Sequence, residues 1–223
     1  MSMVMDDAKT VLPVQPDLPP LGKGAATRGR ILDIAQAAIL AKGFAATSIE
    51  EVIAEAGITK GGFFYHFKDK NELARELLRR YIAENDQVFD SVFARGQELA
   101  DDPLDGFLIS LKLLAGVMGD LPSVHPGCLI AAICYQERLF DRQVRELITE
   151  SVVSWNQRFM AHLETIAAIH PVCGDVDLEQ LARMLSCIVD GAIIMSKSLQ
   201  DPKAVENQIL AYRAFVRLAF AKA

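Results

Sequence analysis

The sequence predicts an all-α protein with an N-terminal three-helix domain that contains a helix-turn-helix and a larger C-terminal helical domain. Apolar residues recur at spacings of three and four from Thr27 onward, which is the period of an amphipathic helix. No run alternates apolar and polar residues over more than four positions, so no strand is expected. A hydrophobic content of 51% supports a sizeable core and excludes a disordered chain.

Net charge and hydropathy argue against several classes of protein. The 223 residues carry a net charge of −6, which disfavours a protein that coats nucleic acid by bulk electrostatics. The charges of residues 1–70 cancel, so the whole net negative charge lies in residues 71–223. A small patch near the N-terminus that contacts DNA is therefore still compatible with the charge of the chain. No apolar run reaches the roughly 18 residues of a membrane helix, and the sequence near the N-terminus does not lead us to expect a secretion signal. We therefore expect a cytoplasmic protein with reduced cysteines and no membrane association.

Residues 1–26 are expected to form a disordered tail. Four prolines fall between positions 13 and 20, and this stretch shows no helical period. Helical periodicity begins at Thr27, which can cap a first helix. This helix should end at Gly43, because glycine tolerates the left-handed conformation that closes many helices.

Two short helices should follow. Ser48 and Glu51 have the spacing of a capping box, which predicts a second helix from this point. The second helix should end at Gly57, and Thr59 should cap a third helix that runs to about Tyr65.

The rest of the chain should contain longer helices. Asp69 is the expected cap of a helix that reaches about Phe93. Periodicity and breakers then predict helices near 103–119, 126–136, 141–148, 151–169, 175–199 and 202–221.

The connection between the second and third helices has the length of the turn in a helix-turn-helix. Gly57 permits the sharp turn, and Ile58 can fill the core between the two helices. The third helix starts with Gly61 and Gly62, whose small size lets its backbone approach a DNA major groove closely. Free N–H groups at both helix starts favour a phosphate near Thr47, Ser48, Thr59 and Lys60.

Residues from Thr27 to about Tyr81 resemble the DNA-binding domain of the TetR family of bacterial transcription regulators. The matching runs are ILDIA at 31–35, KGFAATSI at 42–49 and IAEAGITKGGFFYHFKDKNEL at 53–73. The match covers about a quarter of the chain. The remaining all-helical part fits the ligand-binding and dimerisation domain of that family in length and helix count.

The resemblance also implies which residues contact DNA. Recognition-helix contacts would come from Thr59, Lys60, Gly61 and Gly62, backbone contacts from His66 and Lys70, and entrance contacts from Thr47 and Ser48. The alternative for the lysines is an ordinary solvated charge. The chain departs from the family at Phe64, where a tyrosine hydroxyl commonly reaches a phosphate. Phe64 cannot donate, so we expect Tyr65 to supply a hydroxyl to a different phosphate or base edge.

The C-terminal helices are rich in flexible or aromatic apolar residues, which suits a pocket for a mostly apolar small-molecule effector. The candidate ligand-binding residues are Phe107, Leu111, Met118, Cys128, Trp155, Phe159 and Met184. For each of them the alternative is plain core packing.

Cys128 follows a Pro-Gly break and should lie near a helix start, where the dipole lowers the pKa of a thiol. Gly127-Cys128-Leu129 resembles a run that in some members of the family carries a cysteine that senses electrophiles or oxidants. The alternative is a buried, inert thiol. His125, Cys128 and Cys134 lack a fourth ligand and the usual zinc spacing, so we expect no metal and no other cofactor.

Two broad apolar stripes near the C-terminus predict a homodimer. The candidate interface residues are Leu181, Leu185, Ile188, Ala192, Ile209 and Val216. Two such helices per chain could pack as a four-helix bundle about a two-fold axis. The alternative is that both stripes are buried within one subunit. A two-fold dimer would present two recognition helices about 34–36 Å apart to a palindromic operator.

The expected organisation is a tail at 1–26, a helix-turn-helix domain at 27–70, and an effector-binding and dimerisation domain at 71–223. The expected function is that of a homodimeric repressor, released from a palindromic double-stranded DNA operator by a small apolar effector. Alternatives are a thiol-based sensor that uses Cys128 and an activator without a small ligand. An enzyme is not expected, because the sequence holds no metal-ligand helix, nucleophile elbow or glycine-rich phosphate loop.

Overall fold

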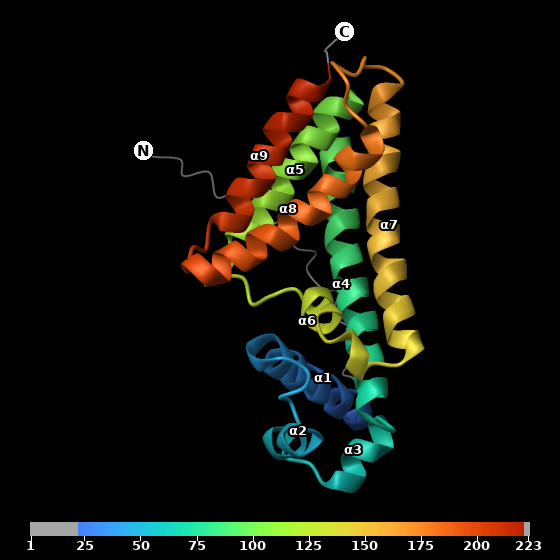
Figure 1. Ribbon diagram of the computed structural model, residues 1–223, viewed down its shortest axis with the longest axis vertical. Helices are drawn as coiled ribbons and strands as arrows, with labels where there is room; N and C mark the ends of the chain where they lie inside the picture. The colour runs from blue at the N-terminus through green and yellow to red at the C-terminus, as the bar shows by residue number, and fades with distance from the viewer. Residues whose placement is uncertain (1–21, 221–223) are drawn as a thin grey trace. The chain divides into compact units, whose positions relative to one another are not determined.

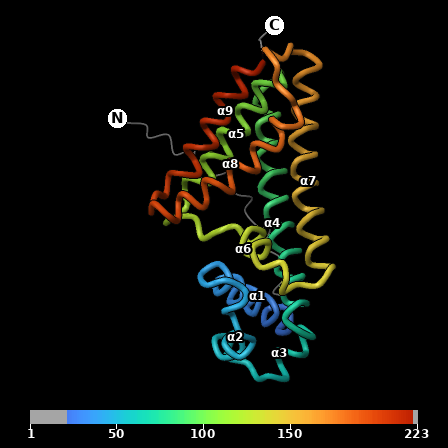
Figure 2. The backbone as a smooth tube through the Cα atoms, viewed as in Figure 1, coloured from blue at the N-terminus to red at the C-terminus, as the bar shows by residue number. Residues whose placement is uncertain are grey.

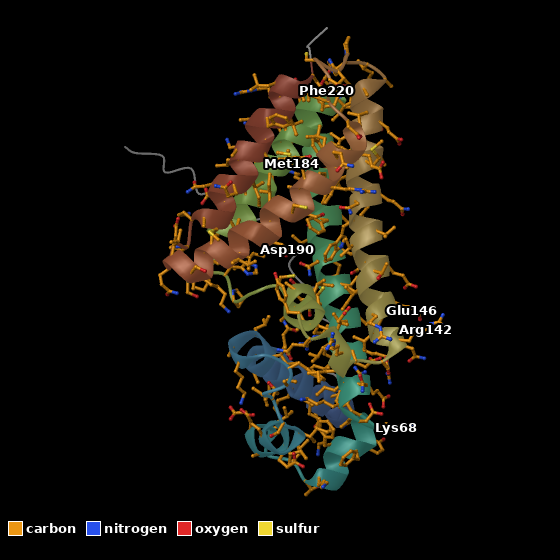
Figure 3. All side chains as sticks on the ribbon, in the orientation of Figure 1. Lys68, Arg142, Glu146, Met184, Asp190 and Phe220 are labelled. Carbon is orange, nitrogen blue, oxygen red and sulfur yellow. The ribbon has the colours of Figure 1, made fainter. Side chains whose placement is uncertain are left out.

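The computed structural model describes residues 22–220, and Figure 1 shows helices connected by short segments. The elements are α1 (Lys23–Lys42), α2 (Ile49–Ala56), α3 (Lys60–His66), α4 (Lys70–Glu98), α5 (Pro103–Gly119), α6 (Leu129–Cys134), η1 (Glu137–Leu139), α7 (Arg142–Ala167), α8 (Leu178–Leu199) and α9 (Ala204–Ala219). The sole β interaction in residues 22–220 is an antiparallel bridge between Val172 and Phe220, which Figure 3 labels. The predicted all-α class is confirmed.

The chain divides into two compact units. The N-terminal unit comprises the described residues 22–84 and 126–154, and the C-terminal unit comprises 85–125 and 155–220. Both α4 and α7 contribute residues to each unit. None of the helices within 22–220 is long and apolar enough to cross a membrane.

In the N-terminal unit, α1 begins earlier than expected. It starts at Lys23, and Thr27 lies inside the helix, where its hydroxyl donates a hydrogen bond of 2.9 Å to the Lys23 carbonyl oxygen. Thr27 is therefore not the cap. The expected tail at 1–26 lies outside the described residues up to position 21, and positions 23–26 are helical.

Helices α1, α2 and α3 bury one common set of apolar side chains. Figure 2 shows the sharp turn of the backbone between α2 and α3. The residues buried within this unit include Ile31, Leu32, Ala35, Ile39, Phe44, Val52, Ala56, Phe63, Phe67, Leu73, Leu77 and Leu78. Helix α6 also belongs to this unit and packs on α1.

In the C-terminal unit, α5, α8 and α9 lie side by side (Figure 1), with α9 in contact with both others. The buried Tyr212 hydroxyl on α9 donates 2.8 Å to the carbonyl oxygen of Leu181 on α8. Arg213 Nε, also on α9, donates 2.7 Å to the carbonyl oxygen of Leu108 on α5. These bonds fix the rotation of α9 between its two neighbours.

Helices α4 and α5 cross closely at two glycines. A methyl group added at Gly96 would lie 2.0 Å from Ser110 Oγ and 2.6 Å from the carbonyl oxygen of Gly106. Only glycine at position 96 therefore permits this approach of the two backbones.

Helix α7 corrects the prediction of two helices at 141–148 and 151–169. It is one continuous helix, and Ser151 does not start a new one, because its hydroxyl donates 2.8 Å to the Ile148 carbonyl oxygen within the helix. At the start of α7, Arg142 Nε donates a hydrogen bond of 2.6 Å to Glu146 Oε1; Figure 3 labels both residues. At α8 the cap is Asp177, whose carboxylate accepts the Glu179 N–H at 2.8 Å.

Candidate nucleic-acid interface

Helix α2 starts and ends as its sequence predicts. Ser48 Oγ accepts the Glu51 N–H at 3.1 Å, and Gly57 closes the helix with a φ of 62°. The Glu51 carboxylate accepts two hydrogen bonds, of 2.5 and 2.6 Å, from Lys42 at the end of α1. These bonds, together with one from the Ser48 backbone that completes the capping box, lower the pKa of Glu51. The bonds from Lys42 connect α1 and α2, which are in contact.

Helix α3 is capped at its start and anchored by two aromatic rings. Thr59 Oγ1 accepts the Gly62 N–H at 3.1 Å. Phe63 and Phe67 are fully buried, with ring centres 5.7 Å apart, and Ile58 in the turn before α3 is half-buried. The α2–turn–α3 segment therefore has the helix-turn-helix arrangement that its sequence predicts.

Three of the nine predicted DNA contacts are exposed on α3, and Ser48 and Thr59, which cap α2 and α3, are exposed as well. Lys60, Gly61 and Tyr65 are exposed, and Tyr65 has 83% of its surface accessible. Phe64 is also 43% exposed, although it is fully apolar. Figure 3 labels Lys68, which is exposed just after α3.

Thr47 and His66 are less accessible than the other candidates. Thr47 is buried, and its hydroxyl donates 3.0 Å to the Gly43 carbonyl oxygen. His66 is half-buried, and its ring lies edge-on to Tyr65 with centres 5.0 Å apart. A methyl group at Gly24 would lie 4.0 Å from His66 Cε1, so the first turn of α1 borders the end of α3.

This neighbourhood adds Lys23 to the candidate DNA contacts, although the sequence favoured a tail that does not contact DNA there. Lys23 is exposed in that first turn, in a stretch that we expected to be a disordered tail. The run of Gly22 and Gly24 around it gave no helical signal. Its place beside α3 makes Lys23 a further candidate for a phosphate contact.

Lys70 uses its ammonium group inside the protein. The group donates 2.6 Å to the Phe44 carbonyl oxygen and lies 4.1 Å from the centre of the Phe44 ring. Burial lowers the pKa of Lys70. Its expected contact with the DNA backbone remains a prediction, and in the described conformation the side chain holds α4 to the connection between α1 and α2.

The segment around η1 covers the same connection from another side. The Phe140 ring lies 4.3 Å from the Phe44 ring, centre to centre. Gln136 Oε1 accepts the Ala45 N–H at 2.9 Å. Residues far along the chain thus fix the backbone just before Thr47.

Ion pairs brace α4 within the same unit. Arg75 pairs with Asp141, whose own N–H donates 3.3 Å to Asn71 Oδ1. Arg28 of α1 pairs with Glu76 and lies 5.1 Å from the centre of the Phe67 ring. The start of α4 is therefore held to α1 and to the residue that precedes α7.

The candidate ligand-binding residues divide between the two units. Cys128 lies in the N-terminal unit, and the other six lie in the C-terminal unit. Phe107, Leu111 and Phe159 are buried, whereas Met118, Trp155 and Met184 are half-buried. Figure 3 labels Met184 on α8. An aromatic cluster joins α4, α5 and α7, and its members are Phe89, Phe93, Phe107, Trp155, Phe159 and His162.

A cleft of about 210 Å³ opens beside this cluster. Its lining residues are Phe89, Asp90, Phe93, Arg158, Phe159, Ala161 and His162. Arg158 donates 2.6 Å to Asp90, and Trp155 Nε1 donates 3.2 Å to Asp86. Burial lowers the pKa of His162. The sequence reasoning missed Phe89 and Phe93, although their spacing of four places both on one helix face.

Cys128 lies at the start of α6, as predicted, but its side chain is buried. It is 8% exposed, and its Sγ accepts the Ala131 N–H at 3.5 Å as the cap of α6. This burial does not favour the thiol-sensor alternative. Within residues 22–220, no three His, Cys, Asp or Glu side chains are grouped to hold a metal ion.

Five of the six candidate dimer residues are buried within the C-terminal unit of a single chain. They are Leu181, Leu185, Ala192, Ile209 and Val216, and Ile188 is half-buried. Other apolar side chains on the same two helices are exposed. Those on α9 are Phe215 and Leu218, 43% and 74% exposed, and those on α8 include Ile194 and Met195.

The chain is similar in sequence to known bacterial transcription regulators. A family model described as bacterial regulatory proteins, tetR family, matches residues 31–77. The probable HTH-type transcriptional regulator ArpR of Pseudomonas putida is 26% identical over 170 residues, which are 75% of this chain and 78% of ArpR. The HTH-type transcriptional repressor KstR2 of Mycobacterium tuberculosis is 32% identical over 80 residues, 36% of each chain.

A solved structure shares the fold over almost the whole chain. It is a TetR transcriptional regulator from Chloroflexus aurantiacus, with a TM-score of 0.72 at 22% identity. The match covers 90% of this chain and 99% of that one.

Proposed function

This chain belongs to the TetR family of bacterial transcription regulators, and we propose that it is a homodimeric repressor. It binds a palindromic operator and leaves it when a small, mostly apolar molecule binds the C-terminal unit. The family consists of regulators, so the chain is not an enzyme. KstR2, which is similar to this chain over 80 residues, is named a repressor, and this name supports the proposed direction of regulation.

One observation carries the DNA-binding part of the proposal. Phe63 and Phe67 anchor α3 from inside, while Lys60, Gly61 and Tyr65 remain exposed on its outer surface. A capped helix with a buried inner side and a free outer side is suited to enter a major groove.

Selection of bound DNA from a random pool tests this proposal. We expect enrichment of two inverted half-sites whose centres lie about 10 base pairs apart, because a two-fold dimer presents its helices one turn of DNA apart. Failure to enrich any inverted repeat would contradict the proposal.

Lys60→Ala tests whether α3 contacts the phosphates. We expect the slope of log Kd against log salt to fall by about 0.9 for each protomer. Lys112→Ala is the matched control, since Lys112 is an exposed lysine on α5. Equal slopes for the two variants would argue against a phosphate contact from Lys60.

The dimer part rests on the apolar residues that α8 and α9 leave exposed. Ala211, Phe215 and Leu218 follow one another at spacings of four and three, so they share one exposed face of α9. Exposed rings and leucines on one face typically mark an interaction surface. A second copy of this face would cover them in a bundle of four helices.

Solution mass measures this association. We expect the wild-type protein to have twice the 24.5 kDa of one chain, and Phe215→Glu/Leu218→Glu to have the mass of a monomer. Ile169→Glu is the control, because Ile169 is an exposed apolar residue outside α8 and α9. A dimeric double variant would show that another surface mediates association.

The effector part rests on the aromatic cluster around Phe89 and Phe159. A ligand there would touch α4 at Phe89 and Phe93, and α4 continues to residues 70–84 of the N-terminal unit. Binding could therefore change the position of the DNA-binding unit through α4.

Trp155 provides a direct assay, since it is the one tryptophan of the chain and its ring lies 6.1 Å from Phe89, centre to centre. Effectors from a panel of apolar compounds should change its fluorescence and release operator DNA at the same concentrations. Phe159→Ala should weaken this response while leaving operator binding without effector intact. A loss of both activities would indicate misfolding rather than an effector contact.

A further inference from the structure

We propose that Gly61, Phe64 and Tyr65 form a notch on α3 that receives the 5-methyl group of an operator thymine. Phe64 is then a specificity-determining residue of the regulator. This inference rests on the proposed function, because it requires that α3 enters a major groove.

Phe64 is the first argument for the notch. It is 43% exposed, and its ring meets the buried Phe63 edge-on with centres 5.4 Å apart. This contact fixes one side of the Phe64 ring and leaves the other open. A phenylalanine has no hydrogen-bond donor for a phosphate or a base edge, so its exposed side is suited to an apolar group.

Gly61 is the second argument. It lies three residues before Phe64 and four before Tyr65, so the three residues are neighbours on the helix surface. Helical side chains lean toward the N-terminus, so both rings flank the surface above Gly61. The notch is therefore a bare stretch of backbone between two rings.

Nothing within the described chain requires a glycine at position 61. A methyl group added there would meet only Thr59 Oγ1, at 4.0 Å, which is an ordinary contact. Glycine nevertheless disfavours the helix compared with alanine. Close approach of a binding partner explains this choice of residue, whereas packing inside the protein does not.

Major-groove chemistry identifies the group that fits. The thymine methyl is the apolar group that base pairs display in the major groove, and phenylalanine is among the side chains that contact it. The notch is apolar on the Phe64 side and small at its base, which suits a methyl group. The hydroxyl of Tyr65 remains free for a neighbouring polar atom.

Deoxyuridine provides the test, because it pairs like thymidine and lacks only the methyl group. Each thymidine of a selected half-site is replaced in turn, and Kd is measured for the full-length protein. We expect one position at which the replacement weakens binding about fourfold, and about fifteenfold when both half-sites are changed. The other positions should change Kd less than twofold.

Variants assign that methyl group to Phe64. Phe64→Ala should bind the thymidine and deoxyuridine operators equally, whereas Tyr65→Phe should keep the fourfold preference. Phe64→Leu keeps an apolar side chain and should retain part of the preference, so it tests the idea even if Phe64→Ala folds poorly. Thermal unfolding of each variant checks the fold.

Gly61→Ala gives an independent measurement, because its two expected effects have opposite signs. The unfolding midpoint should stay unchanged or rise, since the added methyl would make only an ordinary contact with Thr59 and alanine favours helices. Operator affinity should fall at least tenfold, since the methyl would occupy the notch.

The outcomes separate this inference from the proposed function. If the protein binds an operator but no thymine methyl matters, or if Phe64→Ala keeps the full preference, the notch proposal is wrong and the regulator remains. Normal operator binding by Gly61→Ala would also overturn it. If no operator is enriched at all, the proposed function itself fails.

Discussion

The Lys70 ammonium group contacts both the carbonyl oxygen and the aromatic ring of Phe44, at 2.6 Å from the oxygen and 4.1 Å from the ring centre. This contact joins the first residue of α4 to the connection between α1 and α2. It makes Lys70 a positioning residue for the helix-turn-helix in the described conformation.

Replacement of Lys70 should show whether this residue positions the helix-turn-helix through Phe44 or contacts a DNA phosphate. Lys70→Gln should lower the free energy of unfolding by about 1 kcal/mol, because it removes a charged hydrogen bond and a cation–π contact. The salt slope of operator binding should stay at the wild-type value, unlike that of Lys60→Ala. A slope reduced by about 0.9 per protomer would show that Lys70 turns outward to a phosphate.

Gln136 should matter for DNA binding although it lies far along the chain from α3. Gln136→Ala removes the acceptor of the Ala45 N–H and frees the backbone before Thr47. We expect operator affinity to fall about threefold and stability by about 1 kcal/mol. The exposed neighbour Glu137 is the control, and Glu137→Ala should bind like the wild type. Equal affinities for the two variants would disprove a positioning role for Gln136.

The α4–α5 crossing predicts a sharp contrast between two glycines. Gly96→Ala should cost about 3 kcal/mol of stability, because the methyl would overlap Ser110 Oγ and the Gly106 carbonyl oxygen. Gly116→Ala on α5 should be neutral or stabilising by up to about 1 kcal/mol, since its methyl would have no neighbour within 4 Å. Urea unfolding measures both values. Adding Ser110→Ala should recover only part of the loss at Gly96, since the backbone overlap remains.

The protonation of His162 should make stability depend on pH. Burial against Phe93 and Phe107 lowers the pKa of His162 below its usual 6.5, so the unfolded chain binds more protons just below that pH. The stabilising effect is complete above pH 6.5 and is lost as the pH falls through the folded-state pKa. His162→Gln should reduce the fall of the unfolding midpoint between pH 6.5 and 5.

A second histidine contributes to the same profile and needs its own control. Burial, with Lys197 nearby, also lowers the pKa of His125. We expect His162→Gln to remove one part of the fall of the unfolding midpoint between pH 6.5 and 5, and His125→Gln another part. An unchanged profile in His162→Gln would mean that this ring does not titrate as described.

Local signals in the sequence predicted the helix-turn-helix well. Ser48, Gly57 and Thr59 act through bonds within four residues of their own position, so their spacing alone revealed the ends of α2 and α3. Thr27 was the expected cap of the first helix, and Ser151 the expected first residue of a later one. Both lie inside helices, where their hydroxyls bond to the preceding turn. A Ser or Thr hydroxyl can cap a helix by accepting a backbone N–H, or it can donate to a carbonyl oxygen of the preceding turn inside a helix. The conformation of the surrounding backbone determines which of these two bonds forms.

Longer-range relations could not be predicted in this way. The partner of Lys70 is Phe44, and the partner of Ala45 is Gln136, at sequence separations of 26 and 91. The apolar stripe of Leu181 and Leu185 predicted burial correctly, but periodicity does not distinguish a face covered by the same chain from one covered by a second chain. Phe215 and Leu218 of α9 could be identified as exposed only from the structure, which shows which apolar residues of α8 and α9 are buried.

The contacts of Phe140 and Gln136 have a consequence for the construction of hybrid regulators. The N-terminal unit is assembled from two separate stretches of chain, 22–84 and 126–154. Transfer of the first stretch alone onto a relative would uncover Phe44 and leave Arg75 without Asp141. Operator preference should therefore move intact between relatives only when both stretches, or matching partners for these residues, are exchanged together.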